Sequence, residues 1–204
     1  MTDVKASTVA GATTDRPRRP SPSEAVASMG LIPTLGVTAG GLGFLRPASG
    51  TWGSLPPAVV AGVLVVAGQP AWLVDVSLVL LLLIGSVACV RFGVAAERTF
   101  GKKDPGQVVA DEVAGQALTL LALPWAGVAS WAGMSVPPDG VPVAMFDAGL
   151  AVAGFLLFRV FDIVKPPPAN GLQRIGGGWG ILIDDLIAAA MAAIVLQVAV
   201  RALF

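Results

Sequence analysis

The chain has 204 residues, of which 55% are hydrophobic and only 13% are charged, and its 13 basic residues balance its 13 acidic residues. Soluble domains carry roughly 25% charged residues, so this composition indicates an integral membrane protein. The zero net charge argues against a nucleic-acid partner, because no basic field is available to replace counterions. At this length we expect one domain.

Two residue types that often carry enzyme chemistry are absent or isolated. The chain has no histidine, and its single cysteine, Cys89, lies in the apolar run 78–90. Burial raises the pKa of a thiol and makes it inert, so Cys89 is expected to be a packing residue. Any chemistry must therefore depend on carboxylates, Lys, Arg, hydroxyl groups and a metal that they hold.

Residues 1–28 form a polar stretch rich in Pro, Ser, Thr and Ala, with three arginines. No apolar segment follows at the position that a cleavable signal peptide requires. The composition predicts a disordered tail on the cytoplasmic side. Residues 29–204 are then the membrane-embedded domain.

Five helices are expected after a polar stretch at 46–54. A spanning helix needs about 20 apolar residues, so the first helix, at 56–68, falls short and is a candidate half-helix. The other four have sufficient length and are expected at 71–96, 108–131, 143–164 and 180–204, with a Gly- and Pro-rich turn at 133–142. The sequence therefore predicts an all-α membrane bundle with four to five transmembrane helices.

Basic residues are distributed unevenly over the predicted loops. Four lie at or beyond the end of the second helix and three lie around the end of the fourth, whereas the turns at 68–70 and 132–142 contain no Lys or Arg. The positive-inside rule places the basic side in the cytoplasm. Arg201, near the C-terminus, is the exception.

Three polar stretches, at 46–54, 104–112 and 159–185, fall on this same predicted side. Their carboxylates near helix ends are Asp111, Glu112, Asp162, Asp184 and Asp185. Such groups are costly near hydrocarbon unless they are paired or bound to a metal. They outnumber Arg159 and Lys165, so a divalent cation is the simplest neutraliser, and oxygen ligands alone favour Mg²⁺.

The same stretches contain groups that suit an anion. Arg159, Asp162 and Lys165 are three residues apart and therefore line one side of a helix. The glycines at 176–178 would present backbone N–H groups at a helix N-terminus, and Gly50-Thr51 and Gly53-Ser54 add similar donors. Carboxylates for a metal, combined with donors for an anion, indicate phosphate chemistry.

Each feature also has a structural explanation when taken alone. Acids such as Asp111 and Glu112 are favourable in the first turn of a helix, and the same holds for Asp184 and Asp185. A basic side chain beside Asp162 can be a simple ion pair, and a glycine run is often only a turn. A small cation transporter is the rival function, but it would place charges near helix midpoints. Their joint location near helix ends favours chemistry on a lipid head group.

Three segments resemble the phosphatidylglycerophosphatase A family, namely DPGQVVADEVAG at 104–115, FRVFDIVKPPP at 158–168 and GGWGILIDD at 177–185. The upstream PASGTWGS at 47–54 is similar to that family's Pro-Gly-Thr-x-Gly-Ser element. The resemblance covers roughly residues 30–200. It departs at Ser49, where the family usually has proline, and at Ala189, where a glycine often follows the paired aspartates.

The resemblance implies a Mg²⁺-dependent phosphatase of the bacterial cytoplasmic membrane that converts phosphatidylglycerophosphate to phosphatidylglycerol. The catalytic residues that it implies are Asp111, Glu112, Arg159, Asp162, Lys165, Asp184 and Asp185. On this hypothesis the five acids hold one or two Mg²⁺, with Asp162 as a ligand or an orienting group. The expected substrate-binding residues are Thr51, Ser54, Arg159, Lys165, Gly177 and Gly178. Water is the expected nucleophile, and an aspartyl-phosphate intermediate is the alternative mechanism. A different phosphorylated lipid is the alternative substrate.

Overall fold

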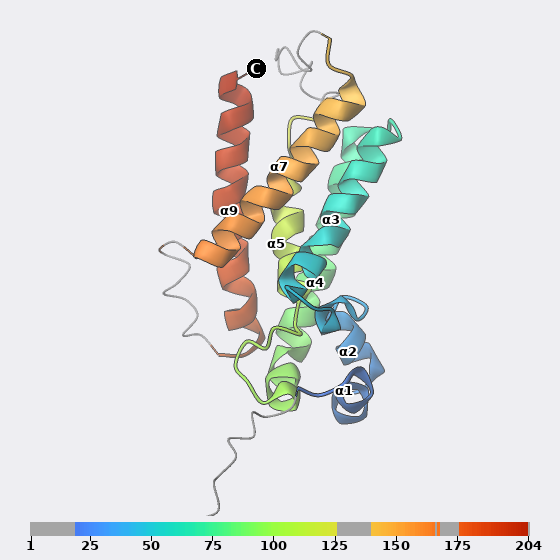
Figure 1. Ribbon diagram of the computed structural model, residues 1–204, viewed down its shortest axis with the longest axis vertical. Helices are drawn as coiled ribbons and strands as arrows, with labels where there is room; N and C mark the ends of the chain where they lie inside the picture. The colour runs from blue at the N-terminus through green and yellow to red at the C-terminus, as the bar shows by residue number, and fades with distance from the viewer. Residues whose placement is uncertain (1–18, 126–139, 166, 168–175, 204) are drawn as a thin grey trace, which may run out of the picture.

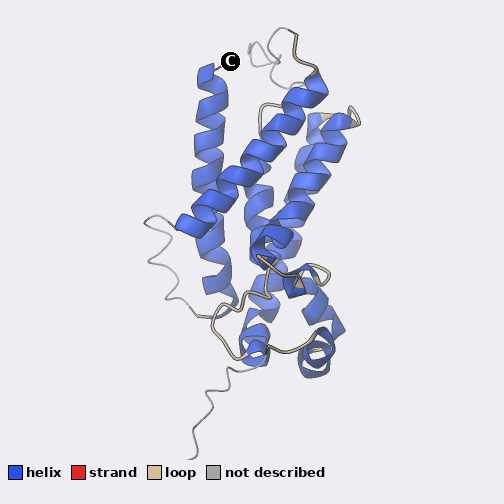
Figure 2. Cartoon of the chain, in the orientation of Figure 1, coloured by secondary structure: helices blue, strands red, loops and turns tan. Residues whose placement is uncertain are grey.

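The computed structural model describes residues 19–125, 140–165, 167 and 176–203 (Figure 1). Their secondary structure is entirely helical (Figure 2), so the prediction of an all-α fold is confirmed. The described elements are α1 (Pro22–Met29), α2 (Leu31–Val37), the 3₁₀ helix η1 (Leu42–Phe44), α3 (Ser49–Val66), α4 (Ala71–Phe100), α5 (Ala110–Leu120), α7 (Val143–Val164) and α9 (Gly177–Leu203).

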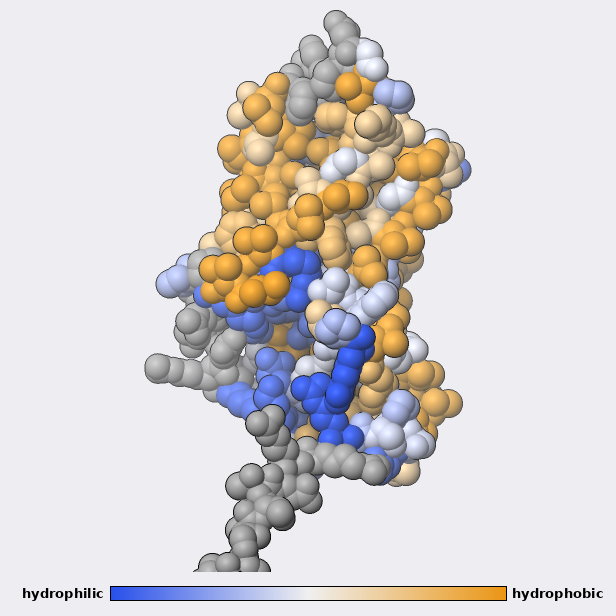
Figure 3. All heavy atoms as spheres, in the orientation of Figure 1, coloured by the Kyte–Doolittle hydropathy of each residue, from blue (hydrophilic) through white to orange (hydrophobic). Residues whose placement is uncertain are grey.

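Four helices, α3, α4, α7 and α9, are long and apolar enough to cross a membrane. Helix α9 runs along the long axis of the molecule and α7 crosses it obliquely (Figure 1), and apolar residues dominate the upper part of the surface (Figure 3). Val63, Ile84 and Ile194 are 62–64% exposed on this surface. Such exposure is unfavourable in water but is the expected contact with lipid tails. The predicted membrane bundle is therefore confirmed.

The short helix α5 lies at the centre of the bundle and packs against α3, α4, α7 and α9. We expected this segment to span the membrane over 108–131, and that prediction is wrong because the helix ends at Leu120. Ala122 then adopts a positive φ, its N–H donates to Asp75 and its carbonyl accepts from Gln197. These side chains replace the helical hydrogen bonds, and Pro124 cannot extend the helix.

The half-helix of the bundle is thus α5, and the first apolar segment is a full span. We expected that segment to begin near 56, but α3 begins at Ser49 and has 18 residues. Its first turns contain glycines because other elements approach them closely. A Cβ added at Gly53 would lie 2.6 Å from a Val109 side-chain atom. Tertiary packing therefore overrides the weak helix propensity of glycine.

The N-terminal helices α1 and α2 support the loop that leads into α5. Residues 22–28 were expected to be disordered, but α1 begins with a capping box between Ser21 and Glu24, a signal present in the sequence. The backbone carbonyl of Val37 at the end of α2 accepts a hydrogen bond of 2.8 Å from Val109. Residues 1–18 of the predicted tail lie outside the described residues.

Helix α7 has the predicted bounds, and α9 begins three residues before the predicted start. Most of the expected turn at 133–142, as well as Trp131, Asp139 and Arg174, lies outside the described residues. Cys89 is fully buried, which agrees with its expected role in packing. Asp147, in the first turns of α7, is only 4% exposed, although its place near a predicted loop would suggest a solvated side chain.

Candidate active site

The polar side chains meet at the level where α5 begins. The first turn of α5 brings Asp111 and Glu112, and α9 brings Asp184 and Asp185 two turns after its start. The last turns of α7 bring Arg159 and Asp162, and the first turns of α3 face them. In Figure 3 the hydrophilic atoms gather below the lower end of α7, beneath the apolar body. The predicted joint location of these groups is thus observed.

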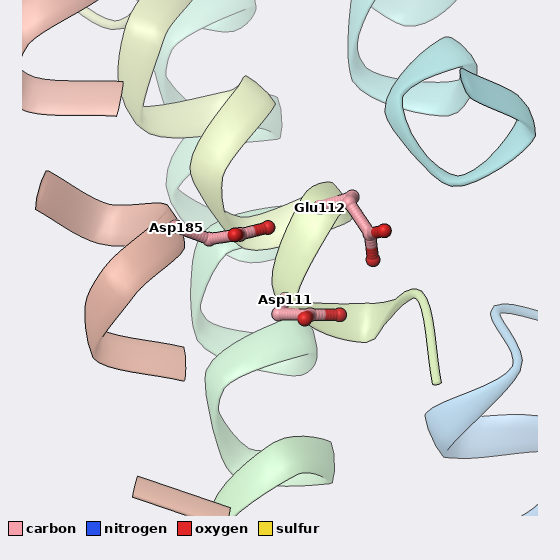
Figure 4. A group of neighbouring side chains, drawn as sticks. All are labelled: Asp111, Glu112 and Asp185. Atoms are coloured by element: carbon pink, nitrogen blue, oxygen red, sulfur yellow. The ribbon is translucent and has the colours of Figure 1, made fainter. Parts of the chain in front are cut away.

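Asp111, Glu112 and Asp185 form a compact carboxylate group, with Asp185 projecting from α9 toward the first turn of α5 (Figure 4). Each offers one oxygen, and these oxygens all lie within 4.8 Å of one another. One oxygen of each side chain is buried and has no hydrogen-bond partner among the described residues. Unpaired buried carboxylates that repel one another are unfavourable. The donor set therefore fits a hard divalent cation, which prefers oxygen ligands.

The other two carboxylates are held by basic side chains. Asp162 accepts a hydrogen bond of 2.7 Å from Arg159, and Asp184 accepts one of 2.5 Å from Lys165. Lys165 Nζ also lies 3.7 Å from Asp162 and 3.8 Å from Asp185. The five predicted metal ligands therefore fall into two sets. Three have no basic partner at hydrogen-bond distance among the described residues, and the other two orient Arg159 and Lys165.

Lys165 reaches these acids because it ends α7 in a left-handed conformation, with φ 44°. Burial alone would lower the pKa of its ammonium group, but the hydrogen bond to Asp184 and the charges of Asp185 and Asp162 raise that pKa on balance. Lys165 therefore stays charged at neutral pH. A fixed positive charge beside the carboxylate group is suited to an anionic ligand.

Ser54 and Gly50 of α3 support Arg159. The Ser54 hydroxyl is fully buried, donates to the Gly50 carbonyl at 2.8 Å and lies 3.5 Å from an Arg159 nitrogen. A Cβ at Gly50 would lie 2.5 Å from a Glu112 oxygen and 3.0 Å from both terminal Arg159 nitrogens. Gly50 thus permits an approach that no other residue type allows, and Ser54 orients Arg159.

The remaining predicted substrate-binding residues have different positions. Thr51 is half-buried in the first turn of α3. Gly177 and Gly178 begin α9, and about 9–10 Å of helix separates them from Asp184 at 1.5 Å per residue. A Cβ at Gly178 would lie 1.9 Å from the Cys89 carbonyl oxygen. The need for glycine at 178 is therefore explained by the crossing of α4 and α9.

Sequence reasoning missed two polar features beside the carboxylates. Gln116 is fully buried one turn after Glu112, and both of its amide atoms lack a hydrogen-bond partner among the described residues. A polar pocket of about 260 Å³ opens beside Asp184 and is lined in part by Lys102 and Asp104. The spacing of Gln116 from Glu112 could have revealed the first feature, because residues four apart share a helix face.

The chain is similar to a family of known enzymes. Residues 35–200 match the family model of phosphatidylglycerophosphatase A. Phosphatidylglycerophosphatase A of Haemophilus influenzae is 33% identical over 157 residues, which are 76% of this chain and 80% of that protein. The Escherichia coli protein of the same name is 34% identical over 100 residues, which are 47% of this chain and 45% of that protein.

A Bacteroides thetaiotaomicron protein named "Putative phosphatidylinositol-3-phosphatase" is 33% identical over 97 residues, which are 48% of this chain and 50% of that protein. No solved structure matches the chain. The matched span of the family model, 35–200, includes all the polar groups described above.

Proposed function

This chain belongs to the phosphatidylglycerophosphatase A family of membrane-bound phosphoric monoester hydrolases, and we propose that its substrate is phosphatidylglycerophosphate. The reaction breaks the bond between phosphorus and the terminal glycerol oxygen. Water supplies oxygen to the departing phosphate, and a proton passes to the glycerol oxygen. The products are phosphatidylglycerol and inorganic phosphate.

The observation that carries this proposal is the compact group of Asp111, Glu112 and Asp185 beside two basic side chains. These three residues would hold Mg²⁺, because their buried oxygens lack other partners among the described residues. A cation held there would supply the positive charge that phosphoryl transfer requires.

Arg159 and Lys165 would bind the phosphate and stabilise the negative charge that develops on it. Asp162 and Asp184 would act as positioning residues, because they hold the two basic groups at 2.7 and 2.5 Å. Arg159 Nε is buried without a partner among the described residues, which leaves a donor for an anion. We assign Thr51, Gly177 and Gly178 no direct contact with the phosphate.

The site would face the cytoplasm. Arg98, Lys102 and Lys103 lie at the same end of the molecule as the carboxylates, and Lys165 belongs to the site itself. Basic residues next to membrane spans favour the cytoplasmic side. This orientation would expose the site to substrate in the cytoplasmic leaflet.

The test is phosphate release from phosphatidylglycerophosphate by purified protein in detergent, with Mg²⁺ and with a chelator. We expect release only with Mg²⁺, and we expect Asp111→Asn and Asp185→Asn to abolish it. Asp75→Asn is the matched control, because Asp75 serves the end of α5 by accepting from Ala122. Full activity in both site variants would overturn the assigned roles.

A second candidate is a phosphatase for another phosphorylated lipid. It is favoured by the similarity to the Bacteroides thetaiotaomicron protein, whose name specifies a phosphatidylinositol 3-phosphate ester. The same assay with phosphatidylinositol 3-phosphate and phosphatidic acid distinguishes the two. A higher kcat/KM for either lipid than for phosphatidylglycerophosphate would replace the proposed substrate and retain the proposed chemistry.

A further inference from the structure

A groove of about 640 Å³ runs along the outer surface of the bundle between α3 and α7. All of its lining residues are apolar. Small residues such as Ala58, Gly62 and Ala151 create the hollow, and larger ones such as Val63 and Val152 form exposed rims. The groove therefore opens sideways onto the surface that faces lipid tails.

One end of this groove lies next to the candidate active site. Leu55, at that end, directly follows Ser54, and Phe155 lies one helical turn before Arg159. Ser54 and Arg159 approach each other to 3.5 Å, so the polar pair closes the groove where the apolar lining stops. From Leu55 to Val66 the groove follows α3 for about 17 Å, at 1.5 Å per residue.

We infer that this groove binds an acyl chain of the lipid whose phosphorylated head group occupies the site. A phospholipid has an apolar chain joined to an anionic head group. The protein has an apolar groove that leads to the positively charged Arg159, so the chain and the head group would each meet a surface of matching chemistry. A chain can enter sideways without leaving the bilayer. The inference rests on the proposed function, and it assigns substrate recognition to residues remote from the phosphate.

Gly62 provides a direct test. A Cβ added there meets no atom within 4 Å, and Gly62 lines the groove, so the side chain of Gly62→Leu would occupy part of the groove. Gly149→Leu on α7 is the matched control, because Gly149 also has open space around it and does not line the groove. Leucine has a higher helix propensity than glycine, so both variants should fold.

The readout compares dioleoyl phosphatidylglycerophosphate with its soluble dihexanoyl analogue. We expect Gly62→Leu to lower kcat/KM for the long-chain lipid by about tenfold, mainly through KM, because the displaced acyl chain loses its packing contacts with the groove. Hydrolysis of the short-chain analogue should stay within about twofold, and Gly149→Leu should change neither reaction. Unchanged long-chain hydrolysis in Gly62→Leu, or equal losses on both substrates, would overturn the inference.

Cross-linking separates this inference from the proposed function. Phosphatidic acid with a diazirine in its acyl chain should label α3 and α7 peptides in the unaltered protein and lose this labelling in Gly62→Leu. If this probe labels the groove but the protein hydrolyses neither phosphatidylglycerophosphate nor another phosphorylated lipid, the proposed reaction is wrong and the groove assignment is supported. Labelling of other helices, or equal labelling by phosphatidylcholine with the same chain, would show that the groove contacts bulk lipid without selecting the substrate. Either result would overturn the inference.

Discussion

At position 50 the absence of a side chain allows two charged groups to reach the start of α3. All three atoms that a Cβ would meet belong to the ends of two flexible side chains, those of Glu112 and Arg159. These ends can move aside, so a methyl group there should leave the fold intact. The added methyl group should nevertheless move the Glu112 carboxylate away from Asp111 and Asp185, and Arg159 away from Ser54.

Gly50→Ala should therefore lower kcat while leaving thermal stability nearly unchanged. A displacement of catalytic groups by about 1 Å reduces rates by about 10- to 100-fold, and we expect a loss in this range. Gly149→Ala on α7 is the control, because its Cβ meets no atom within 4 Å and Gly149 lies outside both the site and the groove. Unaltered kcat in Gly50→Ala would show that this close approach has no role in catalysis.

Asp185→Asn should change stability in opposite directions with and without a divalent cation. Removing one of three repelling buried carboxylates should raise the thermal midpoint in chelator. A cation that binds only the folded protein stabilises it by about 2.7 kcal/mol at a concentration about 100 times Kd, and the variant should lose most of this gain.

The measurement is thermal unfolding in detergent across a Mg²⁺ titration. Asp75→Asn should retain the full Mg²⁺-dependent shift, because Asp75 lies outside the carboxylate group. An equal shift in Asp185→Asn would remove this residue from the proposed ligand set, irrespective of its effect on activity.

At the scale of elements, the backbones of α4 and α9 make contact where small residues face each other. A Cβ at Gly93 would lie 2.5 Å from Gly178 Cα, and one at Gly178 would lie 1.9 Å from the Cys89 oxygen. These obstacles are backbone atoms, which cannot rotate away. Close backbone approach between small residues is the usual basis of helix packing in lipid.

Gly178→Ala should therefore destabilise the protein, by about 1–3 kcal/mol as for other overpacked sites. Gly176→Ala, two residues earlier, meets open space and should have almost no effect. The thermal midpoint of each variant in detergent provides the comparison. Equal stability, with activity lost only in Gly178→Ala, would instead support the predicted anion-binding role of this glycine.

Helix α7 could be predicted to the residue because its 22 residues form one apolar segment between Pro142 and the pair Lys165-Pro166. The extents of α3 and α5 could not be predicted. From the sequence alone, Ser49 to Ser54 resemble a loop, because the packing of Val109 and Glu112 against their glycines is visible only in the structure. The apolar run after Leu120 is typical of a helix in the sequence. In the structure, side chains of Asp75 and Gln197 form hydrogen bonds with its backbone in place of helical ones.

The polar residues of the site could be predicted by type, because charges are rare in this chain and gather in few segments. Which carboxylates pair with basic side chains, and which form the carboxylate group, could not be predicted. Asp184 and Asp185 are adjacent in sequence, yet successive residues on a helix point about 100° apart. Asp184 therefore pairs with Lys165, and Asp185 joins Asp111. Gln116 is harder to predict, because a single uncharged amide in an apolar run stands out only by its spacing from Glu112.

At the scale of the whole molecule, the groups of the candidate site lie at a similar distance from the far ends of three helices. The distance along α3 from Gly50 to Val66, along α7 from Val143 to Asp162 and along α9 from Asp185 to Leu203 is about 24–29 Å at 1.5 Å per residue. The hydrocarbon core of a bilayer is about 30 Å thick. These lengths support our proposal that the site lies near one membrane surface, where a lipid head group is found, and not at the midplane that suits a transporter.

This depth, combined with the basic residues at the same end, predicts the orientation of the protein in the cell. A cysteine introduced by Lys103→Cys should be labelled by an impermeant maleimide only in inside-out vesicles. One introduced by Gln69→Cys, in the turn between α3 and α4, should be labelled in intact cells. Cys89 is fully buried, so the unaltered protein should give no background. The reverse pattern would place Asp111, Glu112 and Asp185 at the outer surface, so the substrate would have to be drawn from the opposite leaflet.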